Sequence, residues 1–266
     1  MYDKYNRHIN YLRISVTDKC NLRCVYCMPQ EGIDLLKHED ILSYEEIVEI
    51  VKYGVAKGID KIRLTGGEPL VRRDITRLIE MISQIEGVKD LSVTTNGILL
   101  GEIADEAAKA GLSRVNVSLD TLDPEKYKKI TRGGDVNRVI EGLHKAKQAG
   151  LTPVKINMVV GSYTTDKDKE DLKNFCSRNN FELRFIQEMD LKKGTFSIVE
   201  GGRGGDCKRC NRLRLTANGM IKPCLFSDIA YNVRELGVDK AFQLALNNKP
   251  KSGTVSSACS FYRIGG

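Results

Sequence analysis

The chain has 266 residues, of which 41% are hydrophobic and 29% are charged, and its formal net charge is +7. This length and composition fit one large α/β domain or two small ones, and they exclude a disordered chain. The longest apolar run, Cys24–Met28, is too short to span a membrane, and no apolar signal segment follows the first residue. We therefore expect a cytoplasmic protein with no membrane partner. The modest charge favours a local site for an anionic ligand and argues against a DNA-binding protein.

Residues 1–189 repeat one pattern, in which a short apolar run is followed by a loop and an amphipathic helix. The predicted strands are Tyr11–Val16, Lys61–Thr65, Leu91–Thr94, Arg114–Leu119, Val154–Val160 and Glu182–Glu188. The predicted helices between them lie near 43–57, 72–86, 101–110, 136–149 and 167–178. This alternation indicates βαβ units and a parallel sheet. Periodicity alone does not decide between a partial barrel and an open doubly wound sheet.

The pattern ends at about residue 190, where the composition changes. Residues 190–206 contain five glycines and are predicted to form a loop or linker. A cysteine-rich stretch follows at 207–228, with one helix expected near 232–247 and a polar tail that ends in two glycines. The sequence therefore divides into a core at 1–189, a glycine-rich linker at 190–206 and a C-terminal segment at 207–266.

Six of the eight cysteines fall into two tight triplets, which in a cytosolic chain favours metal binding over disulfides. The first triplet is Cys20, Cys24 and Cys27, and the second is Cys207, Cys210 and Cys224. A 4Fe–4S cluster normally takes four cysteines, so three would leave one iron open to bind a small molecule. The alternative is a zinc site with a distant fourth ligand, for which Cys259 is the candidate beside the second triplet.

Basic residues surround the second triplet, with six between positions 203 and 224 against one acid, Asp206. Arg212 and Arg214 are two residues apart, so they point to the same side if the segment is extended. Two guanidinium groups beside an open metal site suit a polyphosphate. The other interpretation of these charges is a solvated face or a contact with RNA phosphates.

Two motifs resemble those of radical S-adenosylmethionine enzymes. One is the first triplet with Tyr26 before its last cysteine, and the other is Gly66-Gly67-Glu68-Pro69, which resembles the methionine-binding motif of that superfamily. The second triplet, with Asn-Arg-Leu-Arg after its second cysteine, and the Gly-Gly end resemble one family more specifically. That family is the GTP 3′,8-cyclases (molybdenum cofactor biosynthesis protein A), and the resemblance covers most of the chain.

The resemblance implies a partial (β/α)6 TIM-like barrel of the radical SAM type, with a C-terminal segment that binds the second cluster. It implies a lyase that uses S-adenosylmethionine and two 4Fe–4S clusters. The reaction would convert GTP to (8S)-3′,8-cyclo-7,8-dihydroguanosine 5′-triphosphate, the first step of molybdenum cofactor biosynthesis. The expected partners are a flavodoxin- or ferredoxin-type reductant and the next enzyme of the molybdopterin pathway, and the expected state is a monomer or homodimer.

The resemblance also implies roles for individual residues. Cys20, Cys24 and Cys27 would hold the first cluster, and Cys207, Cys210 and Cys224 the second. S-adenosylmethionine would be contacted by Tyr26, Gly67, Ser118 and Met189. GTP would be contacted by Arg13, Arg63, Thr94, Lys155, Arg212 and Arg214, and the last two would also act in catalysis.

One departure and two alternatives accompany this interpretation. The family usually has several dozen more residues between Met189 and Cys207, so the docking of the C-terminal segment is in question. A radical SAM peptide or cofactor maturase with an auxiliary cluster would share the first triplet and the Gly-Gly-Glu-Pro motif. A zinc-ribbon RNA-binding protein would explain the second triplet and its basic neighbours.

Overall fold

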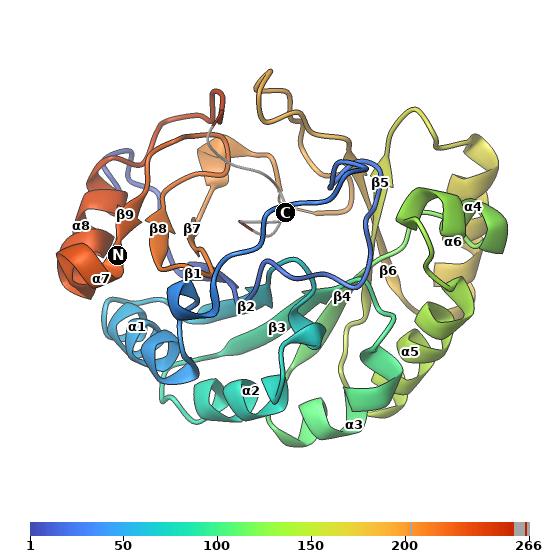
Figure 1. Cartoon of the computed structure of the whole chain (residues 1–266), viewed down its shortest axis with the longest axis horizontal. Helices are drawn as coiled ribbons and strands as arrows, with labels where there is room; N and C mark the ends of the chain where they lie inside the picture. Colours follow the sequence, from blue (N-terminus) through green and yellow to red (C-terminus); the bar gives the residue numbers. More distant parts are fainter. Residues whose placement is uncertain (203, 258–263, 265–266) are drawn as a thin grey trace.

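The first six strands lie side by side in chain order, and helices cover the outer face of the sheet that they form (Figure 1). The computed structural model describes residues 1–202, 204–257 and 264. The strands are β1 Tyr11–Ser15, β2 Lys61–Thr65, β3 Asp90–Thr95, β4 Arg114–Ser118, β5 Lys155–Val160 and β6 Glu182–Gln187. Each pairs in parallel with the next. Because β6 stands at one edge of the curved sheet, the barrel is partial, as predicted.

Most of the predicted helices are confirmed within a few residues. They are α1 Tyr44–Ala56, α2 Ile75–Ser83, α3 Leu100–Lys109, α4 Pro124–Thr131, α5 Val136–Gln148 and α6 Asp166–Asn179. The prediction missed α4, which begins with proline at its first position behind the capping side chain of Asp123. It also started α2 too early, because Asp74 adopts a left-handed backbone conformation with φ of 55°.

The C-terminal segment extends the barrel sheet. It contains β7 Arg212–Leu215, β8 Met220–Lys222 and β9 Tyr231–Asn232, and β7 pairs in parallel with β1. The single helix expected near 232–247 was wrong, since Gly237 with φ of 78° separates α7 Val233–Leu236 from α8 Val238–Asn247. Residues 190–202 and 204–206 lie in the predicted loop, in which Glu200 bridges back to Phe185 on β6. Cys259 and the final two glycines lie outside the described residues.

Side chains on the barrel strands alternate between two environments. Outward positions such as Leu12, Ile14 and Leu64 are fully buried against the helices. Inward positions carry polar groups such as Arg13 and Arg63. Strands of a parallel sheet are usually apolar on both faces, so the polar inner face marks a chamber built for a ligand.

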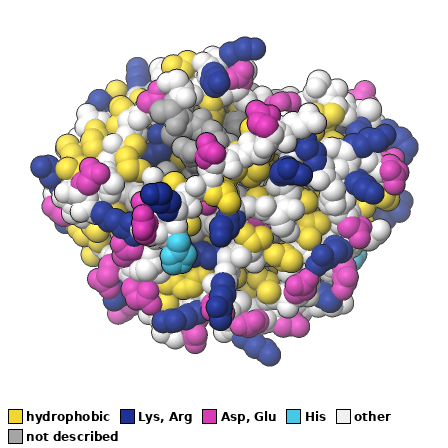
Figure 2. Space-filling model, in the orientation of Figure 1, with side chains coloured by type: hydrophobic (Ala, Val, Ile, Leu, Met, Phe, Trp, Pro, Cys, Tyr) yellow, Lys and Arg dark blue, Asp and Glu magenta, His cyan; other side chains and the backbone are white. Residues whose placement is uncertain are grey.

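The outer surface carries no extended field of one charge on the face that Figure 2 shows. Lys and Arg side chains are interspersed there with Asp and Glu. No helix among the described residues is long and apolar enough to cross a membrane.

Candidate active site

The loop after β1 carries the first cysteine triplet and is held by the end of α4. The amide of Arg23 donates to the carbonyl of Thr131 at the end of α4, at 3.1 Å. Arg132, which follows that helix in a left-handed conformation, donates to the carbonyls of Arg23 and Met28 at 2.9 and 2.8 Å. The protein itself thus fixes the conformation of this loop.

The three thiols of this loop are largely buried and influence one another. Burial raises the pKa of Cys20 to about 11 and that of Cys27 to about 12, and it raises the pKa of Cys24 as well. Thiols with such pKa values remain protonated at neutral pH unless a metal replaces the proton. Three soft sulfur donors on one short, fixed loop fit an iron–sulfur cluster.

The Gly-Gly-Glu-Pro motif packs against the backbone that leads into this triplet. A Cβ on Gly66 would lie 2.4 Å from the carbonyl oxygen of Thr17, and one on Gly67 would lie 2.3 Å from that of Lys19. The amide of Gly67 donates to Thr17 at 2.8 Å. Only glycine fits at these two positions, because any side chain would push this backbone away.

Glu68 of the same motif connects the carboxyl ends of β2 and β3. Its carboxylate accepts hydrogen bonds from the hydroxyl of Thr95 (2.7 Å) and from the amides of Asn96 (2.6 Å) and Leu70 (3.0 Å). Burial raises the pKa of Glu68 to about 7. The side-chain amide of Asn96 donates to Cys20 Sγ at 3.9 Å. The motif and the first triplet therefore form one connected structure.

The predicted contacts for S-adenosylmethionine fall in two places. The Tyr26 hydroxyl donates to Asp120 at 2.9 Å, and its ring stacks on Tyr163 with centroids 5.8 Å apart. Ser118 ends β4 two residues before Asp120. Met189, which follows β6, lines the chamber that also contains the second triplet.

The second triplet lines a chamber of about 680 Å³ inside the barrel. Cys207 begins a short 3-10 helix, Cys210 follows it, and Cys224 follows β8. Burial alone would raise the pKa of Cys210, but the charges of Lys249 and Arg212 outweigh it and the pKa is lowered. Burial raises the pKa of Cys224, against the opposing charge of Lys249. Sulfur donors beside buried cations suit thiolate ligands of a cluster.

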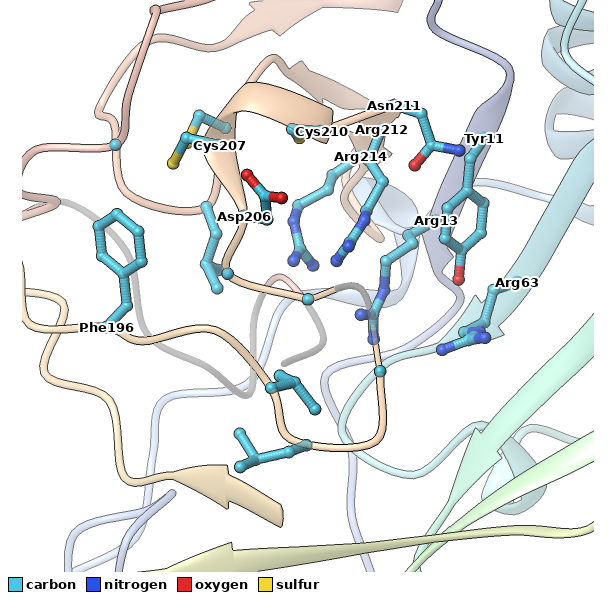
Figure 3. Close-up of a pocket in the computed structure, with 18 of the residues that line it drawn as sticks. Tyr11, Arg13, Arg63, Phe196, Asp206, Cys207, Cys210, Asn211, Arg212 and Arg214 are labelled. Carbon is cyan, nitrogen blue, oxygen red and sulfur yellow. The ribbon is translucent and has the colours of Figure 1, made fainter. Parts of the chain in front are cut away.

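Three neighbouring strands place guanidinium groups side by side on the chamber wall (Figure 3). Arg13 of β1 aligns in register with Arg63 of β2 and with Arg214 of β7. On the same strands, Tyr11 aligns with Arg212, and the guanidinium groups of Arg63 and Arg212 lie 5.4 and 5.9 Å from its ring centre. The predicted GTP-binding arginines are therefore brought together.

Arg13, Arg63 and Arg214 form a strongly positive row on the chamber wall, and two of them are buried. Arg13 and Arg214 are only 7% and 6% exposed. Burial and the adjacent guanidinium groups lower the pKa of Arg214 to about 10, and the same causes lower that of Arg13. Of the acids in the described lining, Asp90 is paired with Arg114 at 2.6 Å and Asp206 caps the following 3-10 helix. An anion with several charges would offset this excess.

Thr94 and Lys155, the other predicted GTP contacts, differ in their placement. Thr94 lines the chamber, and its hydroxyl has no hydrogen-bond partner among the described residues. Lys155 lies on β5, two residues before Asn157. Asn157 lines the chamber, but Lys155 is not in the described lining. Its ammonium forms an ion pair with Glu182 of β6. This ion pair would compete with a contact to GTP.

Three cations in the lining were not singled out from the sequence, namely Lys61, Arg114 and Arg184. The Nε of Arg184 is buried and has no hydrogen-bond partner among the described residues. Lys61 and Arg184 each lie two positions from another residue of the lining, Arg63 and Ile186. The alternation of strand side chains could have identified both from the sequence.

The two triplets occupy different parts of the site. In the described lining of the chamber all three cysteines of the second triplet are present and none of the first. No group of three or more His, Cys, Asp and Glu side chains that could hold a single metal ion occurs in the part of the chain that the structure describes.

Comparison with known proteins gives a consistent result. Residues 14–176 match the Radical SAM superfamily. The GTP 3′,8-cyclase of Thermodesulfovibrio yellowstonii is 43% identical over 89% of this chain and 88% of its own length. That of Clostridium botulinum strain Hall is 38% identical, and 319 aligned positions cover both chains completely. The crystal structure of Streptococcus suis SuiB bound to precursor peptide SuiA has a TM-score of 0.69 at 17% identity, over 94% of this chain and 67% of that one, which shows a shared fold.

Proposed function

We propose that GTP is cyclised in the arginine-lined chamber, because this chain belongs to the GTP 3′,8-cyclase family of the radical SAM superfamily. Enzymes of this class use S-adenosylmethionine and 4Fe–4S clusters and act in molybdenum cofactor biosynthesis. The observation that carries the assignment is the row of Arg13, Arg63 and Arg214 beside the second cysteine triplet. A nucleoside triphosphate supplies the negative charge that this row lacks.

The two triplets are the ligands of the two clusters in this proposal. Cys20, Cys24 and Cys27 hold the first cluster, and Cys207, Cys210 and Cys224 hold the second. When bound, the clusters and S-adenosylmethionine supply one-electron cleavage of the sulfonium and removal of hydrogen from the GTP ribose. A cluster held by three cysteines would have one iron without a protein ligand, where the cofactor would bind at the first cluster and the guanine at the second.

The remaining roles are assigned from membership of this family, except that of Arg184, which lines the chamber. Arg13, Arg63, Arg212 and Arg214 bind and orient GTP, with Thr94 as a hydrogen-bonding group and Arg184 as an additional cation. Arg212 and Arg214 also act in catalysis, as the family implies, and they line the same chamber as Cys210. Lys155 contacts GTP when its ammonium is released from the ion pair with Glu182. Tyr26, Gly67, Ser118 and Met189 position S-adenosylmethionine.

Three further assignments belong to the same proposal. Residues 1–189 form the radical SAM core, 190–206 a shortened linker, and 207–266 the segment that carries the second cluster. A flavodoxin- or ferredoxin-type protein supplies the electron, and the next enzyme of the molybdopterin pathway receives the product. The protein acts as a monomer or homodimer in the cytoplasm.

The decisive experiment follows two products in one reaction. The anaerobically reconstituted chain is incubated with GTP, S-adenosylmethionine and a reductant, and cyclised nucleotide and 5′-deoxyadenosine are measured by mass spectrometry. We expect both products from the wild type, and 5′-deoxyadenosine without cyclised nucleotide from Arg212→Ala. Wild-type protein that cleaves the cofactor but never cyclises GTP would contradict the proposal and favour the peptide-maturase alternative. Zinc in place of iron and sulfide would favour the RNA-binding alternative.

A further inference from the structure

A lysine in the C-terminal segment lies directly behind the second cysteine triplet. Lys249 follows α8 and is 1% exposed. Its ammonium donates to the carbonyl of Arg212 at 2.7 Å and to that of Pro223 at 2.5 Å. It also forms a side-chain hydrogen bond with Cys210 and acts electrostatically on Cys224. One buried cation thus touches the backbone next to two of the three cluster ligands.

Among the residues that the structure describes, no carboxylate forms an ion pair with this ammonium. None of the ion pairs formed among the described residues includes Lys249, and its partners are two carbonyls and the cysteine sulfurs. A buried ammonium is costly unless an anion accompanies it. Thiolate ligands of a cluster at the second triplet would supply negative charge beside this ammonium.

The neighbouring backbone is fixed independently by a second buried cation. Arg7, which forms a salt bridge with Asp3 at 2.6 Å, donates to the carbonyl of Cys207 at 2.8 Å. It also donates to the carbonyls of Pro250 and Lys251 at 2.7 and 3.0 Å. The N-terminal segment therefore holds both the first cysteine of the triplet and the turn that carries Lys249. Such support fixes the position of the ammonium relative to the ligands.

We propose that Lys249 is a positioning residue of the second cluster, which holds the segments of Cys210 and Cys224 together and raises the reduction potential of the cluster by its positive charge. This inference rests on the proposed function, since it requires a cluster at the second triplet. A fixed positive charge stabilises the reduced state, which carries one more negative charge than the oxidised state. The same hydrogen bonds connect the two chain segments that bear the ligands.

The test measures the cluster itself and does not depend on GTP turnover. Lys249→Met is compared with Lys222→Met in the full-length chain, with the first triplet changed to serine so that only the second cluster is observed. Lys222 is the matched control, because it is a lysine of the same segment, 2% exposed, whose ammonium donates to the carbonyl of Ser227 at 2.9 Å. Iron and sulfide per chain are determined first, followed by a redox titration monitored by electron paramagnetic resonance.

We expect Lys249→Met to change the ratio of reduced to oxidised cluster at least about tenfold at a fixed potential, a lowering of about 59 mV for one electron. Lys222→Met should lower the potential less than Lys249→Met does, because the Lys222 ammonium donates to the carbonyl of Ser227, whereas that of Lys249 bonds Cys210 itself. A loaded Lys249→Met with the wild-type potential would overturn the inference. If Lys249→Met binds no cluster, Lys249→Arg decides: a loaded cluster supports a requirement for the charge, and an empty one overturns it. A parent chain that binds no second cluster would instead refute the proposed function.

Discussion

Replacing Arg214 with methionine should stabilise the unliganded protein while it weakens GTP binding. The pKa of this guanidinium falls from the usual 12.5 to about 10 because of burial and of the charge of Arg212. At about 1.4 kcal/mol per pKa unit, the charged guanidinium lowers the free energy of unfolding by about 3 kcal/mol. The side chain also makes favourable contacts that methionine would lose. We therefore expect a net gain of about 1–2 kcal/mol in the free energy of unfolding.

The same change should have the opposite effect on the substrate. A charge-assisted hydrogen bond contributes about 1.5–3 kcal/mol, so its loss should weaken GTP binding by at least about tenfold. Urea unfolding of the cluster-free chain gives the first quantity, where a higher midpoint is expected. Equilibrium dialysis of GTP against the reconstituted enzyme gives the second.

The control for this prediction is Arg73→Met. The Arg73 side chain is 94% exposed, so its loss should alter neither stability nor GTP binding. If Arg214→Met lowers the urea midpoint and leaves the affinity for GTP intact, Arg214 is a structural residue and the like-charge argument fails.

Three other changes test separate parts of the site. Gly67→Ala should destabilise the protein by about 1–3 kcal/mol and reduce the iron held by the first triplet, because the alanine Cβ would lie 2.3 Å from a carbonyl oxygen. Gly101→Ala is the control: its Cβ would have no contact below 3.5 Å, so this variant should retain the iron. The raised pKa of Glu68, about 7, means that the folded chain keeps a proton that the unfolded chain releases, so the unfolding free energy of cluster-free protein should fall from about pH 5 to pH 7. Glu68→Gln should flatten that slope in urea titrations, and an unchanged slope would assign it to other groups. Glu182→Gln should free Lys155 and tighten GTP binding while Lys155→Met weakens it, and equal affinities in all three proteins would remove Lys155 from the site.

The barrel was predictable because each strand is an apolar run between clear turn and helix signals. All six predicted strands agree with β1–β6 within one residue at each end. The failures have local causes. A proline that begins α4 was not recognised as a helix start, and Gly237 interrupts a segment whose apolar pattern looks continuous.

The level of each side chain in the barrel could not be predicted, because it depends on the register between strands. Alternation shows that Arg13 and Arg63 face one side, but only the pairing of β1 with β2 and β7 puts Arg13 beside Arg63 and Arg214. The ion pair of Lys155 with Glu182 could not be predicted for the same reason. Glu182 reaches it only because β5 and β6 align these two residues.

The 190–206 segment forms part of the chamber wall, because Phe196, Val199 and Gly202 lie in the described lining. About 53 of the 319 positions aligned with the Clostridium botulinum relative have no residue in this 266-residue chain. The C-terminal segment is nevertheless attached by β7, which pairs with β1 from Tyr11–Arg212 to Ile14–Leu215. Arg7 adds a further connection at Cys207. A change in the length of the 190–206 segment would therefore alter the wall that includes Phe196, which packs on Phe226 with ring centres 4.5 Å apart, and would leave Arg13, Arg63 and Arg214 attached to the sheet.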